Sequence, residues 1–251
     1  MDRSIRERIA SDESNVYTEW HQLRQRYRHI FEAPNSQRLS QAFDEFLRKE
    51  VPGKSLLEIG CGSGGLALRM ASYSAASVLA TDISHTRIAT AQEHNTSSTC
   101  TFIIADVSLP IEGVYDMIVG TAILHHLDYQ EVLSRLYRDN LTPGGVMLFR
   151  EPLGGNLLMK LFRSLSSQAH TEDERAFEPC DLAWIQHSFE DFTLTPANYF
   201  TLPLGVASGL LFKNPDNWLL RLADRLDVWV AQHVVWLRSH FRYAMFIIRK
   251  H

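Results

Sequence analysis

The residues best placed to bind a ligand form a glycine-rich turn after a short apolar run. Residues 56–66 read LLEIGCGSGGL, in which Gly60, Gly62 and Gly64 alternate with small side chains. Glycine lets a ligand approach the backbone where a Cβ atom would collide, and the start of a following helix presents free N–H groups. The pattern predicts a site for a nucleotide-like ligand, although a tight strand-to-helix turn without a ligand has the same spacing. It is not a phosphate loop, because no Lys-Ser or Lys-Thr pair follows.

Two aspartates occupy equivalent places after the next two apolar runs. Asp82 follows the run at 78–81 and lies 20 positions beyond Gly62, and Asp106 follows the run at 102–105. In a strand–helix–strand unit, a carboxylate at the tip of the adjacent strand can accept hydrogen bonds from both hydroxyls of a ribose. Asp106 is suitably placed to accept one from an adenine amino group. The other interpretations are a helix cap for Asp82 and a turn-forming role for Asp106.

These residues depend on a regular alternation of short apolar runs and amphipathic stretches that begins at Ser55. Continuously apolar strands are typical of burial on both faces, and strand–helix alternation predicts a parallel, doubly wound α/β sheet. Residues 1–52 are mostly helical in pattern, with a turn at 33–36. The expected strands are 55–59, 77–81, 100–105, 115–120, 146–150, 192–200 and 241–249, and the expected helices are 66–73, 84–94, 128–141, 181–189 and a long one opening at Asn214-Pro215.

Residues 54–150 resemble the class I S-adenosylmethionine-dependent methyltransferases of the small-molecule type. The glycine turn, the two aspartates and the segment YDMIVGTAILHHL at 115–127 occur in the family's order and at its spacing. The resemblance implies a Rossmann-like sheet of seven strands, mostly parallel with an antiparallel last strand, together with helical insertions. It also implies S-adenosylmethionine as the methyl donor and S-adenosylhomocysteine as the product.

In this family the donor lies across the carboxyl ends of the first, second and fourth strands. Carried over by motif position, residues of the glycine turn border the methionine part, and the strand-end acids and their neighbours hold ribose and adenine. Thr121 holds the amino-acid end, and Tyr17 or Trp20 folds over the donor. The implied donor contacts are Glu58, Gly60, Cys61, Gly62, Asp82, Ile83, Asp106, Val107, Thr121 and Tyr17.

The glycines alone are also compatible with a nicotinamide cofactor. Gly65 completes a Gly-x-Gly-x-x-Gly register from Gly60 and Gly62, and that register is typical of dinucleotide sites. The strand before Asp106, the pair His125-His126 and the lack of a Tyr-x-x-x-Lys pair favour the methyl donor.

Methyl transfer from a sulfonium is a direct displacement, in which the protein mainly aligns the nucleophile, the methyl group and the sulfur. An alcohol or phenol acceptor must also lose a proton. His126 is the first candidate for the general base and His125 the second, because both follow the fourth strand and imidazole titrates near neutrality. Glu151, just beyond the fifth strand, is a candidate for acceptor contact. Alternatively, the histidines bind backbone or the donor carboxylate, and Glu151 is a turn acid before Pro152.

We therefore expect methyl transfer to a small organic acceptor in biosynthesis, at oxygen rather than at nitrogen or carbon. No Asn-Pro-Pro-Tyr-like tetrapeptide follows the fourth strand, which counts against nucleobases and protein glutamine as acceptors, and no acidic triad predicts a metal. The alternatives are a lipid or quinone methyltransferase at a membrane surface, and a non-catalytic donor-binding partner subunit.

The expected organisation is an N-terminal helical segment at 1–52 that covers the site, followed by a methyltransferase domain at 53–251. Insertions at about 153–180 and 201–240 are expected to shape an apolar or aromatic acceptor pocket. The long helix after Pro215 carries an apolar face that suits such a pocket, or packing on the core or on a second copy. This face comprises Leu219, Leu222, Leu226, Trp229, Val230, His233 and Leu237.

Composition limits the class of partner and the compartment. The 251-residue chain is 45% apolar and 22% charged with a net charge of −4, which is typical of a globular protein and counts against nucleic acid. Three cysteines match no zinc or disulfide pattern and residues 1–15 have no apolar signal core, so we expect a cytoplasmic monomer or homodimer. Residues 213–251 hold seven basic and three acidic side chains, which is the argument for the membrane alternative.

Overall fold

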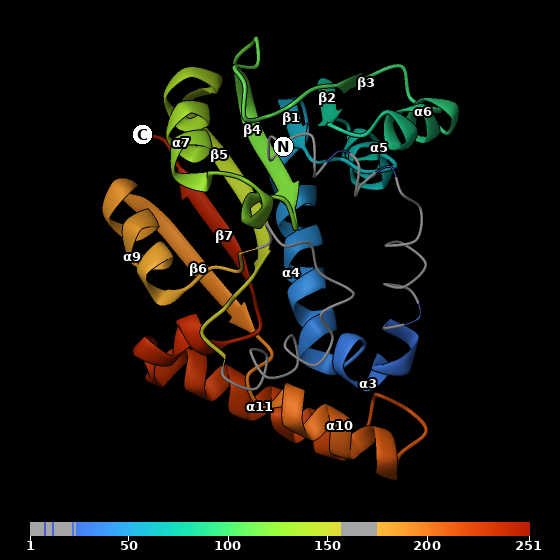
Figure 1. The fold of residues 1–251 in the computed structure, drawn as a ribbon, viewed down its shortest axis with the longest axis vertical. Helices are drawn as coiled ribbons and strands as arrows, with labels where there is room; N and C mark the ends of the chain where they lie inside the picture. The colour runs from blue at the N-terminus through green and yellow to red at the C-terminus, as the bar shows by residue number, and fades with distance from the viewer. Residues whose placement is uncertain (1–7, 9–11, 13–21, 23, 157–174) are drawn as a thin grey trace.

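The computed structural model describes residues 8, 12, 22, 24–156 and 175–251, and these residues form one seven-stranded sheet covered by helices (Figure 1). The strand order is β3-β2-β1-β4-β5-β7-β6. Strands β1 to β5 pair in parallel, and β7 runs antiparallel to both of its neighbours. The expected doubly wound α/β sheet with an antiparallel last strand is confirmed.

The expected alternation of strands and helices is present. In the first half of the chain the elements are α3 (Arg28–Phe31), α4 (Pro34–Glu50), β1 (Ser55–Ile59), α5 (Gly65–Ser72), β2 (Ser77–Asp82), α6 (His85–Glu93), β3 (Cys100–Ile104) and β4 (Tyr115–Thr121). In the second half they are the 3-10 turn η1 (Leu124–His126), α7 (Tyr129–Arg135), the π-turn η2 (Leu136–Asn140), β5 (Leu141–Pro152), α9 (Pro179–Ser188), β6 (Asp191–Ala197), α10 (Thr201–Leu211), α11 (Trp218–His233), η4 (Val235–His240) and β7 (Tyr243–Arg249).

Both faces of the sheet are buried, because consecutive apolar residues of each central strand point to opposite faces. One apolar layer contains Leu57 and Phe149 together with residues of α7 and α9. The other contains Leu56 and Leu148 together with residues of α4, α5 and α6. This arrangement explains why the central strands are continuously apolar in sequence.

The boundaries differ from expectation mainly around β5. It runs from Leu141 to Pro152 rather than over 146–150, so it also includes the Pro143-Gly144-Gly145 segment. The pairing of β4 with β5 shifts register between Tyr115 and Met117. A β-bulge of this kind accommodates extra residues in one strand without ending the pairing.

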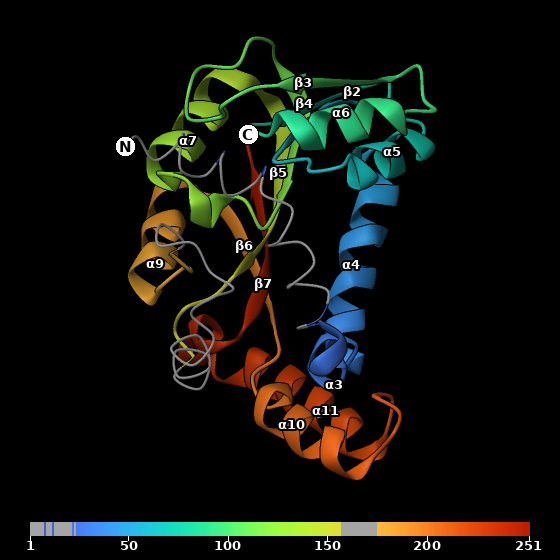
Figure 2. The same cartoon turned by 45° about the vertical axis from the view of Figure 1, so that its right-hand side comes forward.

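The long connection between the last two strands forms α10, α11 and η4. Both views place α10 and α11 side by side at one end of the molecule, toward which the arrows of β4 and β6 point in Figure 1 (Figures 1 and 2). Helix α11 begins at Trp218, because the Asn217 side chain caps it by accepting from the N–H groups of Leu219 and Leu220. The start expected at Asn214-Pro215 was therefore wrong by several residues.

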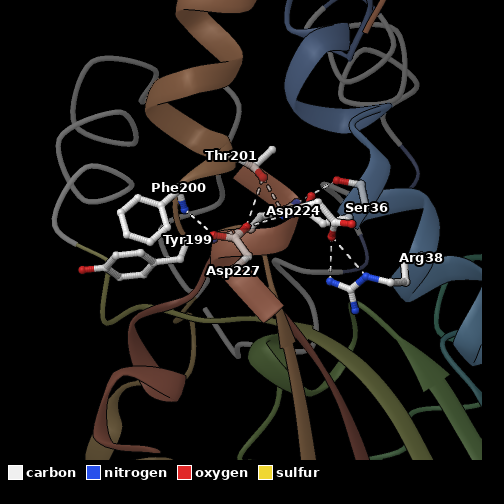
Figure 3. Close-up of polar contacts among 9 residues, drawn as sticks. Ser36, Arg38, Tyr199, Phe200, Thr201, Asp224 and Asp227 are labelled. Atoms are coloured by element: carbon white, nitrogen blue, oxygen red, sulfur yellow. Dashed lines mark hydrogen bonds and ion pairs between the residues drawn. The ribbon is translucent and has the colours of Figure 1, made fainter. Parts of the chain in front are cut away.

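Polar contacts hold α11 against α4 and the start of α10 (Figure 3). The buried Asp227 carboxylate accepts from the Phe200 N–H at 2.7 Å, from the Tyr199 N–H at 3.1 Å and from the Thr201 hydroxyl at 3.1 Å. The Asn35 side chain of α4 also donates to it. The inner face of α11 is thus joined to its neighbours by hydrogen bonds as well as by apolar contact.

Candidate functional site

The glycine turn connects β1 to α5 in a conformation that favours glycine at three places. Gly60, Gly62 and Gly64 have φ values of +67°, +54° and +83°. A Cβ atom on Gly60 would lie 2.7 Å from Ile123, and one on Gly64 would lie 2.7 Å from Phe102. A Cβ atom on Gly62 would have 3.8 Å to its nearest neighbour. Gly60 and Gly64 are therefore required by packing within the protein, whereas a Cβ atom at Gly62 would make only an ordinary van der Waals contact, with the Arg87 side chain.

Asp82, at the end of β2, reaches across to the glycine turn. Its Oδ2 accepts from the Gly62 N–H at 2.8 Å, and its Oδ1 accepts from the Ser84 N–H at 2.9 Å. The cap of α6 is Ser84, whose hydroxyl accepts from the Arg87 N–H, so the helix-cap interpretation of Asp82 was wrong. Two backbone donors hold the carboxylate still, and each oxygen keeps a second lone pair for another donor.

Glu58 and Cys61 line the inner side of the same turn and are buried. Burial, together with the nearby charge of Asp82, raises the pKa of the Glu58 carboxyl to about 8. Its Oε2 has no hydrogen-bond partner among the described residues. Burial also raises the pKa of the Cys61 thiol. The turn therefore presents a neutral thiol and a buried acid with one unused oxygen.

Asp106 follows β3 and forms a local turn. Its Oδ1 accepts from the Ser108 N–H at 2.9 Å, and its carbonyl oxygen accepts from the Leu109 N–H at 3.0 Å. The turn-forming interpretation is confirmed, and contact with adenine stays a prediction. Of the neighbouring predicted contacts, Val107 is buried and Ile83 is half-buried.

Glu151 is fully buried in β5 and organises the segment that follows β4. Its Oε1 accepts from the N–H groups of Ile123 and Leu124, both at 3.0 Å. Its Oε2 lies 2.7 Å from Nδ1 of His125. Three protein groups therefore occupy this carboxylate, and Glu151 lies within a strand rather than in a turn. The sequence places Glu151 near the histidines but gives no sign of this hydrogen-bonding arrangement.

The two histidines differ in exposure. His125 is buried against Glu151, whereas His126 is half-buried, and their ring centroids are 4.1 Å apart. A carboxylate at Nδ1 favours the tautomer of His125 that carries its proton there, which leaves Nε2 as an acceptor. His125 is thus a positioned imidazole, and His126 packs on it with more of its ring accessible.

Between β4 and the two histidines, the backbone adopts a left-handed conformation that the sequence did not predict. Ala122, directly after Thr121 at the end of β4, has a φ of +53°. This left-handed conformation is uncommon for a residue with a Cβ atom. The Ala122 N–H donates to the carbonyl of Arg150 at 2.9 Å. It turns the chain away from the sheet directly after Thr121, which is half-buried.

The N-terminal segment also reaches the site. The Asp12 carboxylate accepts from the Ser84 hydroxyl and from the Thr86 N–H, at the start of α6 and next to Asp82. Tyr17 lies outside the described residues. Within the described part of the chain, no group of three or more His, Cys, Asp or Glu side chains is arranged to hold a metal ion.

Residues 56–145 match a protein-family model described as a methyltransferase domain. This span contains the glycine turn, Asp82, Asp106 and the histidine pair. The chain therefore contains a methyltransferase domain within this span. The resemblance seen in the sequence and the Rossmann-like fold are confirmed, while methyl transfer by this chain and the individual site residues stay predictions. No curated protein matches this sequence.

Solved structures with the same fold include two methyltransferases. Phosphoethanolamine N-methyltransferase 2 of Haemonchus contortus, solved with phosphomonomethylethanolamine and S-adenosylhomocysteine, is 20% identical with a TM-score of 0.60 over 90% of this chain. This chain spans only 56% of that protein's length. Magnesium protoporphyrin IX methyltransferase of Synechocystis PCC 6803, solved with S-adenosylhomocysteine, is 14% identical with a TM-score of 0.59 and full coverage of both chains.

A third neighbour is named for a different reaction. The [4+2]-cyclase SpnF is 17% identical, with a TM-score of 0.53 over 86% of this chain and 83% of its own. Likeness of fold at these identities therefore does not fix the reaction, which has to be argued from the site.

Proposed function

We propose that this protein transfers a methyl group from S-adenosylmethionine to an oxygen atom of a small organic acceptor. The observation that carries the proposal is the arrangement of Asp82 and Gly62. A buried carboxylate is held by two backbone N–H groups beside a glycine whose Cβ position has no protein atom nearer than the Arg87 guanidinium at 3.8 Å. A ribose has two neighbouring hydroxyls, which can donate to the two oxygens of such a carboxylate. The glycine lets the ribose approach the backbone beside it.

The remaining residues of the turn fit the other parts of the donor. When bound, the donor supplies an activated methyl group on a sulfonium. The buried Oε2 of Glu58 has no partner among the described residues, and it can accept from the ammonium at the amino-acid end. The neutral Cys61 thiol offers a weakly solvating wall beside the sulfonium. Ile83, Asp106, Val107 and Thr121 are proposed to complete the adenine and amino-acid contacts, and Tyr17 to cover them.

The residues after β4 are proposed to handle the acceptor's proton. His126 takes it as general base, because its ring is the more accessible of the pair. His125 is a positioning residue, since Glu151 fixes its ring and the ring packs on His126 at 4.1 Å. A base aligned by a neighbour that is itself held by a carboxylate removes a proton without reorganisation.

Residues 1–52 are proposed to cover the donor, and the insertions at about 153–180 and 201–240 to shape an apolar or aromatic acceptor pocket. The contact of Asp12 with Ser84 supports the first assignment, because it ties the N-terminal segment to the loop after β2. The position of α10 and α11 supports the second, since they lie at the end of the molecule toward which β4 points (Figure 1).

Calorimetric titration of the full chain with S-adenosylmethionine and S-adenosylhomocysteine tests the proposal at the donor. Asp82→Ala should weaken binding of both by about 1–3 kcal/mol, because the ribose hydrogen bonds are lost. Asp139→Ala is the matched control, since this exposed carboxylate pairs with Arg138 on η2, away from the glycine turn. If the wild-type chain binds neither compound, the proposal is wrong.

A donor-binding subunit without catalytic activity is the competing function, and the [4+2]-cyclase of the same fold shows that the fold hosts other roles. Incubation with isotopically labelled donor and a panel of phenols and alcohols separates the two. Transfer of label that is lost in His126→Ala supports catalysis at oxygen. Donor binding with no transfer to any acceptor class supports the silent subunit.

A further inference from the structure

Helix α11 exposes a continuous row of large apolar side chains. Trp218, Leu222, Leu226 and Trp229 are spaced by four, four and three residues, which keeps them on one face of a helix. Trp218 is 65% exposed and Trp229 is 55% exposed. Trp236 in η4 is 70% exposed. The face that the sequence suggested for a pocket or for core packing instead borders solvent over most of its length.

Helix α10 shows the same arrangement. Its eleven residues include no charged side chain. Its exposed side carries Val206, Leu210 and Leu211, whereas its buried side carries Leu202 together with the small and polar residues Thr201, Gly205 and Ser208. Among these, Ser208 hydrogen-bonds to Nδ1 of His29 at 2.9 Å. A Cβ atom on Gly205 would lie 2.6 Å from Ile30 of α3, so α3 packs closely on this side.

Both helices therefore carry large apolar side chains on the outside, while their buried sides combine apolar residues such as Leu202, Leu220 and Val230 with polar ones. The inner side of α11 carries Asp227, which binds the start of α10, and Asp224, which binds Arg38 of α4 (Figure 3). A surface helix in water normally has its large apolar side chains on the stripe that faces the core. Two adjoining helices that carry a second, exposed apolar row indicate that their outer face contacts an apolar phase.

We propose that this outer face, formed by α10, α11 and η4, docks on the surface of an anionic phospholipid bilayer. Tryptophan is the side chain that prefers the boundary between headgroups and acyl chains, and three tryptophans of α11 and η4 are exposed. No described helix is long and apolar enough to cross a bilayer, so the contact is with the surface. The proposal does not depend on the proposed reaction.

The charge of this face is complementary to anionic lipid. Residues 201–240, which form α10, α11 and η4, hold four basic and three acidic side chains. Arg249 and Lys250 do not belong to this face, because they contact Glu50 and the carbonyl groups of η2 at the far end of β7. The three acids of residues 201–240 are already engaged, because Asp216 pairs with Arg221, Asp224 pairs with Arg38 and Asp227 is buried. Lys213 and Arg225 are exposed beside the apolar row. A two-fold contact with a second copy would bring Lys213 and Arg225 of both copies into one interface, where like charges repel.

Sedimentation of the full chain with sucrose-loaded vesicles tests the proposal. Vesicles of phosphatidylcholine with 30% phosphatidylserine should bind the protein, with a blue shift of tryptophan fluorescence, and pure phosphatidylcholine should bind it more weakly. Raising the salt concentration should also weaken binding, because exposed charges are screened.

Trp218→Ser/Trp229→Ser should lower the partition coefficient by about tenfold or more, since two interfacial anchors are lost. Lys213→Gln/Arg225→Gln should reduce the preference for phosphatidylserine.

Leu109→Ser/Val114→Ser is the matched control. It removes two exposed apolar side chains from the connection between β3 and β4, which both figures place at the opposite end of the molecule from α10. This variant should bind vesicles as the wild type does, and circular dichroism should show that every variant is folded. The proposal is overturned if the wild type binds neither vesicle. It is also overturned if the wild type is a dimer that Trp218→Ser/Trp229→Ser dissociates, because the face would then join two copies.

Discussion

Three buried carboxyl groups near the carboxyl ends of the strands have different partners, and those partners decide what each can do. Asp82 is held by two backbone N–H groups, and Glu151 by two N–H groups and an imidazole. Glu58 keeps one oxygen without a partner in the described chain, and its pKa is raised to about 8 mainly by burial. The sequence could identify Asp82 from its spacing to the glycine turn. The partners of Glu151 could not be predicted, because they come from the backbone of a segment 27 and 28 residues away.

His126→Ala should lower kcat for an alcohol or phenol acceptor by a factor of about 100 or more, the usual range for a general base. Donor affinity should be unchanged, because the proposed donor contacts do not include His126. Steady-state kinetics and donor titration on the same protein measure the two effects. His251→Ala is a control at an exposed histidine. Unchanged turnover of His126→Ala would remove it as the base.

Glu151→Ala should lower the free energy of unfolding by about 3 kcal/mol or more, because buried donors at Ile123, Leu124 and His125 lose their acceptor. Glu151→Gln keeps one acceptor oxygen and should cost less. Urea unfolding gives both values. If Glu151 positions the histidines, the Gln variant should also shift the pH profile of kcat with little change in donor KM. A loss of stability without such a shift would leave Glu151 with a purely structural role.

Substitution by alanine should lower the free energy of unfolding by different amounts at two glycines of the turn. Gly62→Ala should cost about 1–2 kcal/mol, the price of a Cβ atom in left-handed backbone, since no neighbour lies closer than 3.8 Å. Gly60→Ala should cost more, because its Cβ atom would lie 2.7 Å from Ile123 and displace the segment that Glu151 holds. Urea unfolding of the two variants measures the difference. Equal losses would contradict the packing seen at Gly60.

At the scale of the elements, the parallel half of the sheet could be predicted because its strands are continuously apolar. Strands β1 to β4 begin and end within one residue of the expected positions. The orientation of α11 could not be predicted, since hydrophobic periodicity assumes that an apolar face is a buried face. Here the buried side of α11 consists of Leu220, Ala223, Asp227 and Val230, and four hydrogen bonds to Asp227 hold that side inward. Tertiary hydrogen bonding thus overrides the amphipathic pattern.

The junction of α4, α10 and α11 should make stability depend on pH through Asp227. Burial raises the pKa of this carboxyl from 3.8 to about 6 in the folded protein. Between these values the unfolded chain loses the proton while the folded protein keeps it, so the folded state binds more protons and stability falls as the pH rises. The expected loss between pH 4 and pH 6 is about 3 kcal/mol for the complete shift.

Urea unfolding of the wild type and of Asp227→Asn across pH 4–7 measures this contribution. The amide of Asp227→Asn does not titrate, so the free energy of unfolding of this variant should lack the fall that Asp227 causes between pH 4 and pH 6. The difference in free energy of unfolding between the two proteins should therefore change with pH over this range. A difference that stays constant from pH 4 to pH 7 would mean that Asp227 is ionised in the folded protein throughout.

At the scale of the whole molecule, one end of the sheet gathers every feature with a proposed function. Parallel strands place their carboxyl ends at a common edge, so the glycine turn, Asp82 and Thr121 meet although they lie in separate parts of the sequence. The insertion between β6 and β7 adds α10 and α11 toward the same end (Figures 1 and 2).

The shared edge also predicts that donor binding stabilises the whole fold. A ligand that contacts several strands binds the folded chain and not the unfolded one, so S-adenosylhomocysteine at about 100 times its Kd should add about 2.7 kcal/mol of unfolding free energy. For a protein of this size the melting temperature should rise by about 5–10 °C. Differential scanning calorimetry of the wild type, Asp82→Ala and Asp139→Ala at one ligand concentration measures it. The shift should shrink in Asp82→Ala and stay complete in Asp139→Ala. An equal shift in all three proteins would mean that the ligand is held somewhere other than beside Asp82.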